Sequence, residues 1–364
     1  MATAKSKSGG LPMIRAGMGD VDSETVEVWS DDDHRRATGL LTILSPDGQA
    51  DQAATPALSG EAARDAYRTM LRIRILGDRA RALVSEGRIA GYPDMRGAEA
   101  AIVGAAAALA ADDVIVPGPR EAAVALHRGL PVAALAAQLF GNANDIGRGH
   151  QPAGYAVSPR ALNVTPASLL PATQLPHAAG IAWAMKMQAR PQLALAYLDR
   201  VATSAEDFHA GLNFAAVFAL PAVFVCANDV AAGAAAAVPE TMSETLAVKA
   251  LAYGMPGVRV DGGDLFAVYA ATTAAAERAR RGGGPTFIEA VIASSSDDPF
   301  DRLRVWLTSQ GIDTADLHKQ VENEIDAALA VEEKVGPPAL HTMIEDVYAT
   351  PPAALEEALR DRGR

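Results

Sequence analysis

Short apolar runs alternate with longer segments of helical periodicity through most of this chain. The strand-like runs are Val114–Val116, Leu193–Tyr197, Ala222–Cys226, Val258–Val260 and Thr286–Ile292. The helical segments include Gly97–Ala111, Glu121–Arg128, Ala178–Met187, Ser204–Ala219, Leu265–Arg281 and Asp316–Val335. Short apolar strands between amphipathic helices are typical of a parallel sheet covered on both faces. The pattern therefore predicts an α/β fold with a mostly parallel central sheet and helices on both faces.

The first 58 residues differ in character from the rest. They contain turn-forming residues and acidic Asp31-Asp32-Asp33 but no sustained helical period, so we expect an extension, either a poorly ordered tail or an arm. Within it, Leu40–Leu44 predicts a strand or an arm segment that packs on a neighbour. The dipeptide Ser59-Gly60, followed by Glu61, is a helix-start signal. We therefore expect one domain over residues 59–364, including C-terminal helices, after an extension over residues 1–58.

Composition narrows the class of protein. The net charge of −12 and pI near 5.1 argue against nucleic acid or an anionic membrane surface as a partner. A single cysteine, Cys226, excludes an internal disulfide framework. Met1–Pro12 is not followed by an apolar stretch of secretory type, so we expect a soluble cytoplasmic protein. Because the Ala-rich helices Gly97–Ala111 and Ala178–Met187 offer little side-chain volume, we expect close backbone contacts there, plausibly with another subunit.

One segment carries most of the functional information. Tyr197–Asp207 reads Tyr-Leu-Asp-Arg-Val-Ala-Thr-Ser-Ala-Glu-Asp, and Leu220–Asp229 leads through an apolar strand to Asn-Asp. This stretch resembles the thiamine-diphosphate segment in the alpha subunit of 2-oxo acid dehydrogenases of the pyruvate and branched-chain type. The family pattern there is Gly-Asp-Gly or Gly-Glu-Gly, then Ala-x-Ser-Glu-Gly-Asp, with an Asn-Asn pair after the strand. Further short motifs in family order extend the resemblance over roughly Ala62 to Leu355.

The resemblance implies a fold, an activity and partners. The fold is the thiamine-diphosphate-binding α/β fold, and the reaction is oxidative decarboxylation of a 2-oxo acid with acyl transfer to a lipoyl group. The family assembles from two alpha and two beta subunits, and the lipoyl group belongs to a core acyltransferase. The cofactors are thiamine diphosphate and Mg²⁺, and the alpha chain holds the diphosphate and the metal. We accordingly expect a beta subunit and the acyltransferase core as partners.

The chain departs from this pattern where the metal should bind. Asp199 and Val201 replace the two glycines, Arg200 replaces the metal-binding carboxylate, and Asp229 stands where the metal-binding Asn belongs. One interpretation is that Arg200 binds the diphosphate directly without metal, because guanidinium groups bind phosphate oxygens bidentately. The other, which we favour, is that Arg200 pairs with a local carboxylate such as Asp229 and closes the site. Asp229 is retained only as a doubtful ligand of a divalent metal.

The remaining candidate residues come from the same resemblance. It implies cofactor contacts at Arg120, Arg200, Ala202, Ser204, Asn228 and Asp229. It implies a site for a monovalent cation such as K⁺ at Ser168, Thr173 and Gln174, whose plainer interpretation is a helix N-cap and buried hydrogen bonds. Ala293 occupies the position of the family's catalytic His, so no catalytic residue is assigned.

Three hypotheses follow. The chain is an alpha subunit by descent with an impaired cofactor site, acting as a structural or regulatory partner of a beta subunit. Alternatively, it is a working enzyme that binds the diphosphate through Arg120 and Arg200. The third hypothesis is a self-associating protein that binds an acidic metabolite in the vacated pocket.

Overall fold

The computed structural model describes residues 31–51, 54–147, 160–230, 240–292 and 298–362. Five strands form one sheet: β1 (Val114–Val116), β2 (Ala194–Asp199), β3 (Ala222–Asp229), β4 (Gly257–Asp261) and β5 (Thr286–Ile292). Their order across the sheet is β1-β2-β3-β5-β4, and every neighbouring pair is parallel. The predicted α/β class with a parallel central sheet is confirmed.

The helices follow the predicted alternation, with shifted ends. The α-helices are α1 (Asp31–Thr38), α2 (Gly60–Ser85), α3 (Glu99–Ala107), α4 (Val132–Phe140), α5 (Gln174–Met187), α6 (Glu206–Val217), α8 (Leu265–Arg280), α9 (Pro299–Ser309), α10 (Leu317–Glu332), α11 (Thr342–Glu345) and α12 (Ala353–Arg362). The 3-10 helices are η1 (Pro119–Leu126), η2 (Arg160–Leu162), η3 (Val201–Ser204) and η4 (Ala247–Tyr253). The helix start at Ser59-Gly60 is confirmed, because the Ser59 side chain accepts a hydrogen bond from the Ala62 N–H group at 3.2 Å.

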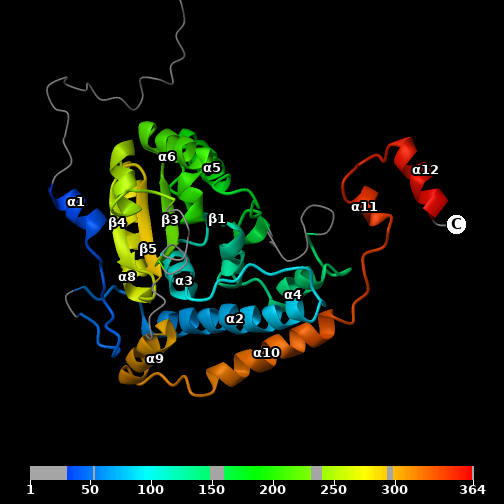
Figure 1. Ribbon diagram of the computed structural model, residues 1–364, viewed down its shortest axis with the longest axis horizontal. Coiled ribbons are helices and arrows are strands. Elements are labelled where there is room, and N and C mark those ends of the chain that lie inside the picture. The colour runs from blue at the N-terminus through cyan, green and yellow to red at the C-terminus, as the bar shows by residue number, and fades with distance from the viewer. Residues whose placement is uncertain (1–30, 52–53, 148–159, 231–239, 293–297, 363–364) are drawn as a thin grey trace, which may run out of the picture.

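Residues of each central strand alternate between two apolar layers. In β2, Leu195 and Tyr197 belong to the layer formed with α2, α3 and α8, whereas Ala196 and Leu198 belong to the layer formed with α5 and α6. Figure 1 shows α5 and α6 above the sheet and α2 below it, with α10 alongside α2. The sheet is thus covered on both faces, as the apolar runs predict.

The Ala-rich helix α3 is buried by its own chain. A Cβ atom placed on Gly104 would lie 3.0 Å from the Leu265 carbonyl oxygen and 3.1 Å from Cβ of Val268, so α3 and α8 approach each other closely. Close backbone packing is therefore confirmed for this helix. Residues Glu99–Ala106 are already buried within the single chain, so a second subunit is not needed to cover this helix.

The N-terminal extension contains a helix and joins the sheet. The acidic run that we interpreted as a turn begins α1, which the sequence did not predict. The Leu41 N–H group donates to the Arg259 carbonyl at 3.0 Å, and the Asp261 N–H group donates to the Leu41 carbonyl at 2.9 Å. Of the two alternatives for Leu40–Leu44, a strand or an arm that packs on a neighbour, the structure supports the first, because Leu41 forms a parallel bridge with the edge strand β4 of the same chain. The buried Asp264 carboxylate accepts hydrogen bonds from the main-chain N–H groups of Ile43 and Leu44, and so anchors the segment that follows Leu41.

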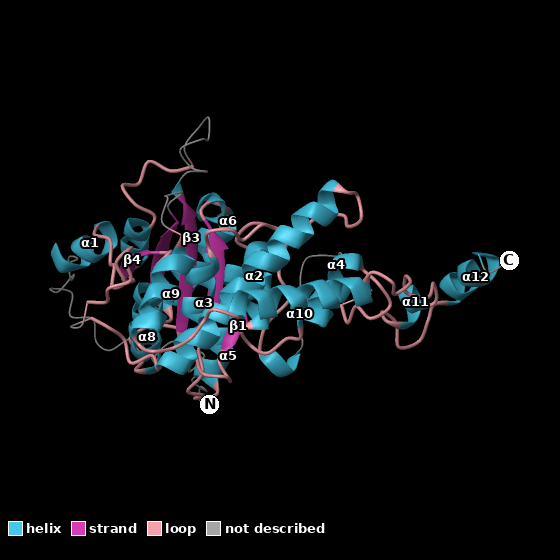
Figure 2. Ribbon diagram, turned by 90° about the horizontal axis from the view of Figure 1, so that it is seen from below, coloured by secondary structure: helices cyan, strands magenta, loops and turns pink. Residues whose placement is uncertain are grey.

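The C-terminal helices α11 and α12 extend away from the sheet in both views (Figures 1 and 2). Within the described ranges, every helix is too short or too polar to cross a bilayer.

Candidate active site

The predicted site residues of β2, β3 and η1 lie at the carboxyl ends of the strands, because parallel strands all end on the same side of the sheet. The β2 strand ends at Asp199, which pairs in register with Ala227 of β3, and β3 continues to Asn228 and Asp229. Arg120 lies in η1, which follows β1, the neighbour of β2. Ligands of parallel α/β proteins bind at this edge of the sheet.

Arg200 is neutralised by a carboxylate within the chain. Its two Nη atoms lie 2.8 and 2.7 Å from the two carboxylate oxygens of Glu240, and both side chains are about four-fifths buried. The Ser204 hydroxyl donates to the Glu240 main-chain carbonyl at 2.9 Å, which holds the acid in place. The prediction that Arg200 pairs with a local carboxylate is therefore confirmed, but the partner is Glu240 and the suggested Asp229 was wrong.

Asp199, Arg200 and Val201 replace the glycine-acid-glycine triplet of the family. They lead from β2 directly into η3 and do not form an open phosphate-binding loop. The Asp199 carboxylate accepts a hydrogen bond from the Ala202 N–H group at 2.9 Å, which holds the first turn of η3. Val201 carries a β-branched side chain that is half exposed at the position of the family's second glycine. Ala202 is a predicted cofactor-binding residue, and its N–H group is thus already hydrogen-bonded within the chain.

Lys249 of η4 is a further cation beside η3. Its Nζ atom donates to the carbonyl and to the hydroxyl of Thr203, both at 3.1 Å. Burial lowers the pKa of Lys249, while the charge of Glu240 opposes this shift. The segment Arg200–Ser204 is thus held by Glu240 on one side and by Lys249 on the other.

Asn228 is also engaged within the protein. Its amide donates to the buried carboxylate of Glu289 on β5 at 2.7 Å. The second oxygen of Glu289 accepts from the Ala247 N–H group at 2.8 Å. Asn228, at the first position of the family's Asn-Asn pair, therefore has a structural role here.

Arg120 and Arg96 line the same small cavity with Asp229. The cavity measures about 10 Å³, roughly enough for one water molecule. Glu121 also lines it, and its apolar lining consists of Met95, Ala98, Ile102, Ala227 and Ile292. The Arg120 Nε atom donates to the Asp94 carbonyl at 3.1 Å. Sequence reasoning missed Arg96, because it lies in a loop without a motif and reaches the site only through the fold.

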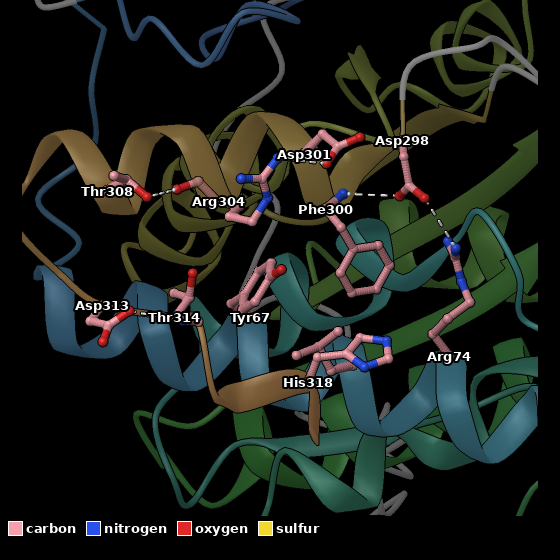
Figure 3. Close-up of a pocket in the computed structure, with 12 residues that line it drawn as sticks. Tyr67, Arg74, Asp298, Phe300, Asp301, Arg304, Thr308, Asp313, Thr314 and His318 are labelled. Carbon is pink, nitrogen blue, oxygen red and sulfur yellow. Dashed lines mark hydrogen bonds and ion pairs between the residues drawn. The ribbon is translucent and has the colours of Figure 1, made fainter. Parts of the chain in front are cut away.

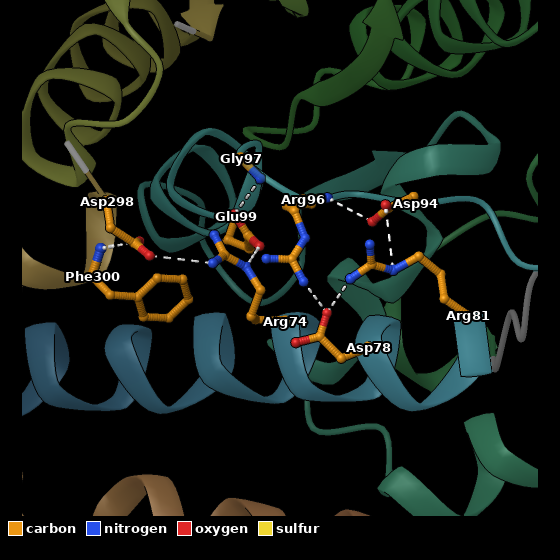
Figure 4. Close-up of polar contacts among 9 residues, drawn as sticks. All are labelled: Arg74, Asp78, Arg81, Asp94, Arg96, Gly97, Glu99, Asp298 and Phe300. Atoms are coloured by element: carbon orange, nitrogen blue, oxygen red, sulfur yellow. Dashed lines mark hydrogen bonds and ion pairs between the residues drawn. The ribbon is translucent and has the colours of Figure 1, made fainter. Parts of the chain in front are cut away.

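Figure 4 shows how Arg96 is held. Its guanidinium group and that of Arg81 both contact the Asp78 carboxylate on α2, while the Asp94 side chain accepts from the Arg96 N–H group at 3.0 Å. Beside them, Arg74 bridges the fully buried Glu99 and the exposed Asp298. Arginine and carboxylate side chains thus alternate along the rim of the site.

A second cavity of about 80 Å³ lies on the other side of Arg120. It is lined by Asp199, Ala202, Glu121 and Gln174, together with the segment 169–172. The Gln174 amide nitrogen donates to the Tyr197 carbonyl at 2.8 Å, but its buried Oε1 atom accepts no hydrogen bond from the residues that the structure describes.

The three residues predicted to bind a monovalent cation differ in their surroundings. The Ser168 hydroxyl accepts from the Leu170 N–H group at 3.1 Å. Thr173 occupies the N-cap position of α5, as the plainer interpretation expects, but its side chain makes no capping hydrogen bond. Of the three, Gln174 alone lines the 80 Å³ cavity.

Glu121, which lines this cavity, changes its protonation state near neutral pH. Burial raises the pKa of its carboxyl group from 4.5 to about 7, and the nearby charge of Asp199 adds to the rise while Arg120 opposes it. The folded protein therefore holds more protons than the unfolded chain between these two values. The stability contributed by protonated Glu121 is complete below pH 4.5 and is lost as the pH rises to about 7.

We expect Glu121→Gln to remove this pH dependence. Between pH 5 and pH 8, the free energy of unfolding should fall by about 2 kcal/mol more in the unmodified protein than in the variant. Urea unfolding at the two pH values measures the difference. The exposed Glu356→Gln on α12 is the matched control and should keep the original slope; equal slopes in all three proteins would contradict the prediction.

Comparison with known proteins assigns this chain to a family. The model of the family "Dehydrogenase E1 component" matches residues 67–293, more than half of the chain. The chain belongs to this family. It is 36% identical over 328 residues to the 2-oxoisovalerate dehydrogenase subunit alpha 2 of Arabidopsis thaliana, covering 82% of this chain and 69% of that protein.

Two bacterial relatives support the same assignment. The 3-methyl-2-oxobutanoate dehydrogenase subunit alpha of Mycobacterium tuberculosis is 35% identical, with 79% of this chain and 84% of that protein covered. The pyruvate dehydrogenase E1 component subunit alpha of Bacillus cereus is 30% identical, with 87% and 90% covered. Among solved structures, a transketolase from Campylobacter jejuni matches with a TM-score of 0.46 and 15% identity over 74% of this chain and 47% of that one. The predicted resemblance to E1 alpha subunits is confirmed.

Among the residues that the structure describes, the side chains at this site do not fit the magnesium diphosphate arrangement that the resemblance implies. A guanidinium group stands in place of the carboxylate ligand, and the cavities beside it measure about 10 and 80 Å³. Over the described ranges, no group of three or more His, Cys, Asp or Glu side chains is arranged to hold a metal ion. Ala293, at the family's catalytic His position, lies outside the described residues.

Proposed function

We propose that this chain is an alpha-type subunit of a 2-oxo acid dehydrogenase whose own cofactor site is closed. It would act as a structural or regulatory partner of a beta subunit. The observation that carries the proposal is the bidentate pair between Arg200 and Glu240, which occupies the position of the metal-binding carboxylate. A guanidinium group there has no oxygen to offer, so one of the oxygen ligands that Mg²⁺ requires is missing.

The second candidate is a working enzyme that binds the diphosphate without a metal. Arg96 favours it, because this residue brings a further guanidinium group to the cavity that Arg120 lines. Arginine binds phosphate bidentately and stays charged at all accessible pH values. For such binding, Glu240 would have to leave Arg200, so the cost of breaking that pair opposes the ligand.

Calorimetric titration with thiamine diphosphate separates the two candidates. We expect the unmodified chain, alone or with a beta subunit, to show no Mg²⁺-dependent binding and almost no rise in melting temperature, because a ligand stabilises only in proportion to its occupancy. Micromolar binding that requires Mg²⁺ would overturn the closed-site proposal. Binding that ignores Mg²⁺ but is lost in Arg200→Ala would instead establish the metal-free candidate.

The monovalent-cation site also remains a proposal. Gln174 supports it, since its Oε1 atom is a buried acceptor beside a cavity that Asp199 and Glu121 also line. Such oxygen atoms suit a hard cation such as K⁺. Pairing with an acyltransferase core is a further proposal and rests on the family resemblance. Cytoplasmic location is also a proposal, and it rests on the sequence, which has no apolar run long enough to span a bilayer.

A further inference from the structure

A separate pocket of about 460 Å³ lies between α2, α9 and the turn that leads into α10 (Figure 3). In this view α9 forms one wall with Arg304 and Asp301, and α2 forms the opposite wall with Tyr67. The segment 313–318 closes one end. The volume falls within the range of about 300–1,000 Å³ that is usual for small-molecule sites.

Two hydroxyl groups line this pocket without a hydrogen-bond partner among the residues that the structure describes. The residues Tyr67 and Thr314 are only 6% and 9% exposed, but their hydroxyl oxygens remain accessible from the pocket. The two hydroxyl groups therefore offer hydrogen bonds to a molecule in the pocket.

The floor of the pocket is apolar and aromatic. Leu71 and Phe300 line it, and the Phe300 ring packs edge-on against the Tyr67 ring at a centroid distance of 5.8 Å. The Arg74 guanidinium group lies over the Phe300 ring, with its central carbon 4.7 Å from the ring centroid. A short apolar side chain would be removed from water here, which favours its binding.

Opposite charges stand close together above this floor. Arg304 donates to the Asp301 carboxylate at 3.0 Å, one helical turn away, and both side chains are at least half exposed. Exposed ion pairs of this kind contribute little to stability, so each partner can be exchanged for a ligand group. A ligand that replaces both must carry a carboxylate and a cation on neighbouring atoms.

We propose that this pocket binds a free α-amino acid with an apolar side chain. The α-carboxylate pairs with Arg304 and accepts from the Tyr67 hydroxyl group, and the α-ammonium group pairs with Asp301. The side chain lies on Leu71 and Phe300. A simple carboxylic acid would leave Asp301 facing its negative charge, and a simple amine would leave Arg304 without an anion, so the zwitterion is favoured over both.

Calorimetry with the full chain tests this proposal directly. L-leucine is the probe, and 4-methylpentanoate and 3-methylbutylamine carry the same apolar chain with only one of its two charges. We expect L-leucine to bind, and each single-charge analogue to bind at least about tenfold more weakly, since each loses one charge-assisted contact. Equal affinity for an analogue would overturn the zwitterion assignment, and no heat from L-leucine up to millimolar concentration would overturn the site.

Variants locate the binding within the pocket. Tyr67→Phe removes a single hydroxyl group and should weaken L-leucine binding by up to about tenfold. Arg304→Gln and Asp301→Asn, both on exposed side chains, should each weaken it by about tenfold or more while leaving the melting temperature nearly unchanged. Arg360→Gln on α12 is the matched control and should bind as the unmodified chain does. L-leucine binding that is unaffected by all three pocket variants would place it elsewhere and overturn the proposal.

Discussion

Magnesium-dependent binding of thiamine diphosphate should appear when the family triplet is restored by Asp199→Gly, Arg200→Asp and Val201→Gly together with Asp229→Asn. The changes remove the cation that Glu240 now neutralises and supply hard oxygen ligands for the metal. Glycine at the two flanking positions lets the backbone approach the phosphates. With ligand at about 100 times its dissociation constant, we expect the free energy of unfolding to rise by about 2.7 kcal/mol.

The control is Glu240→Ala in the otherwise unmodified chain, which frees Arg200 without creating a metal ligand. It should show no Mg²⁺-dependent binding, although metal-free binding of the diphosphate can improve. The restored variant should still lack turnover, because Ala293 supplies no imidazole. If the restored variant is folded by circular dichroism and binds no better than the unmodified chain, the triplet is not what closes the site.

The largest loss of stability is expected from Asp113→Ala. This fully buried carboxylate accepts from the N–H groups of Leu193 and Ala110 at 2.9 and 2.8 Å and forms an ion pair with Arg280. It thereby ties the loop before β1 to the start of β2 and to α8. Its removal leaves two N–H groups and one cation without their partner, which costs about 3–5 kcal/mol in the free energy of unfolding.

Asp112→Ala provides the matched control for this experiment. Asp112 is exposed and accepts one hydrogen bond from the Gln192 side chain, so the same substitution one residue earlier should change stability by about 0.5 kcal/mol or less. Urea unfolding of both variants gives the comparison. Similar losses in the two variants would show that the Asp113 contacts contribute little.

The sequence was sufficient for the order and type of most elements. The strand Thr286–Ile292 was predicted with its observed bounds, and the start of α2 was read from Ser59-Gly60. Both depend on local signals: a strand buried along its whole length has a continuous apolar run, and a helix start has a capping side chain.

Partners distant in the sequence were beyond such reasoning. Arg200 and Glu240 are forty residues apart, and nothing in the local pattern distinguishes Glu240 from Asp229 as the acid that Arg200 meets. Arg96 reaches the Arg120 cavity from a loop, and Leu41 pairs with β4 across more than two hundred residues. Each of these contacts depends on how loops lie over the finished sheet.

The chain by itself thus determined the α/β class, the family and the loss of the metal-binding carboxylate, since these depend on residue identity and on periodicity within a few turns. The tertiary structure alone decided what neutralises Arg200, that α1 and Leu41 cover the β4 edge, and that Tyr67 and Thr314 share a pocket with Arg304. These features depend on the pairing of charges and hydrogen-bonding groups from separate elements. Burial imposes that pairing only after the fold has brought the elements together.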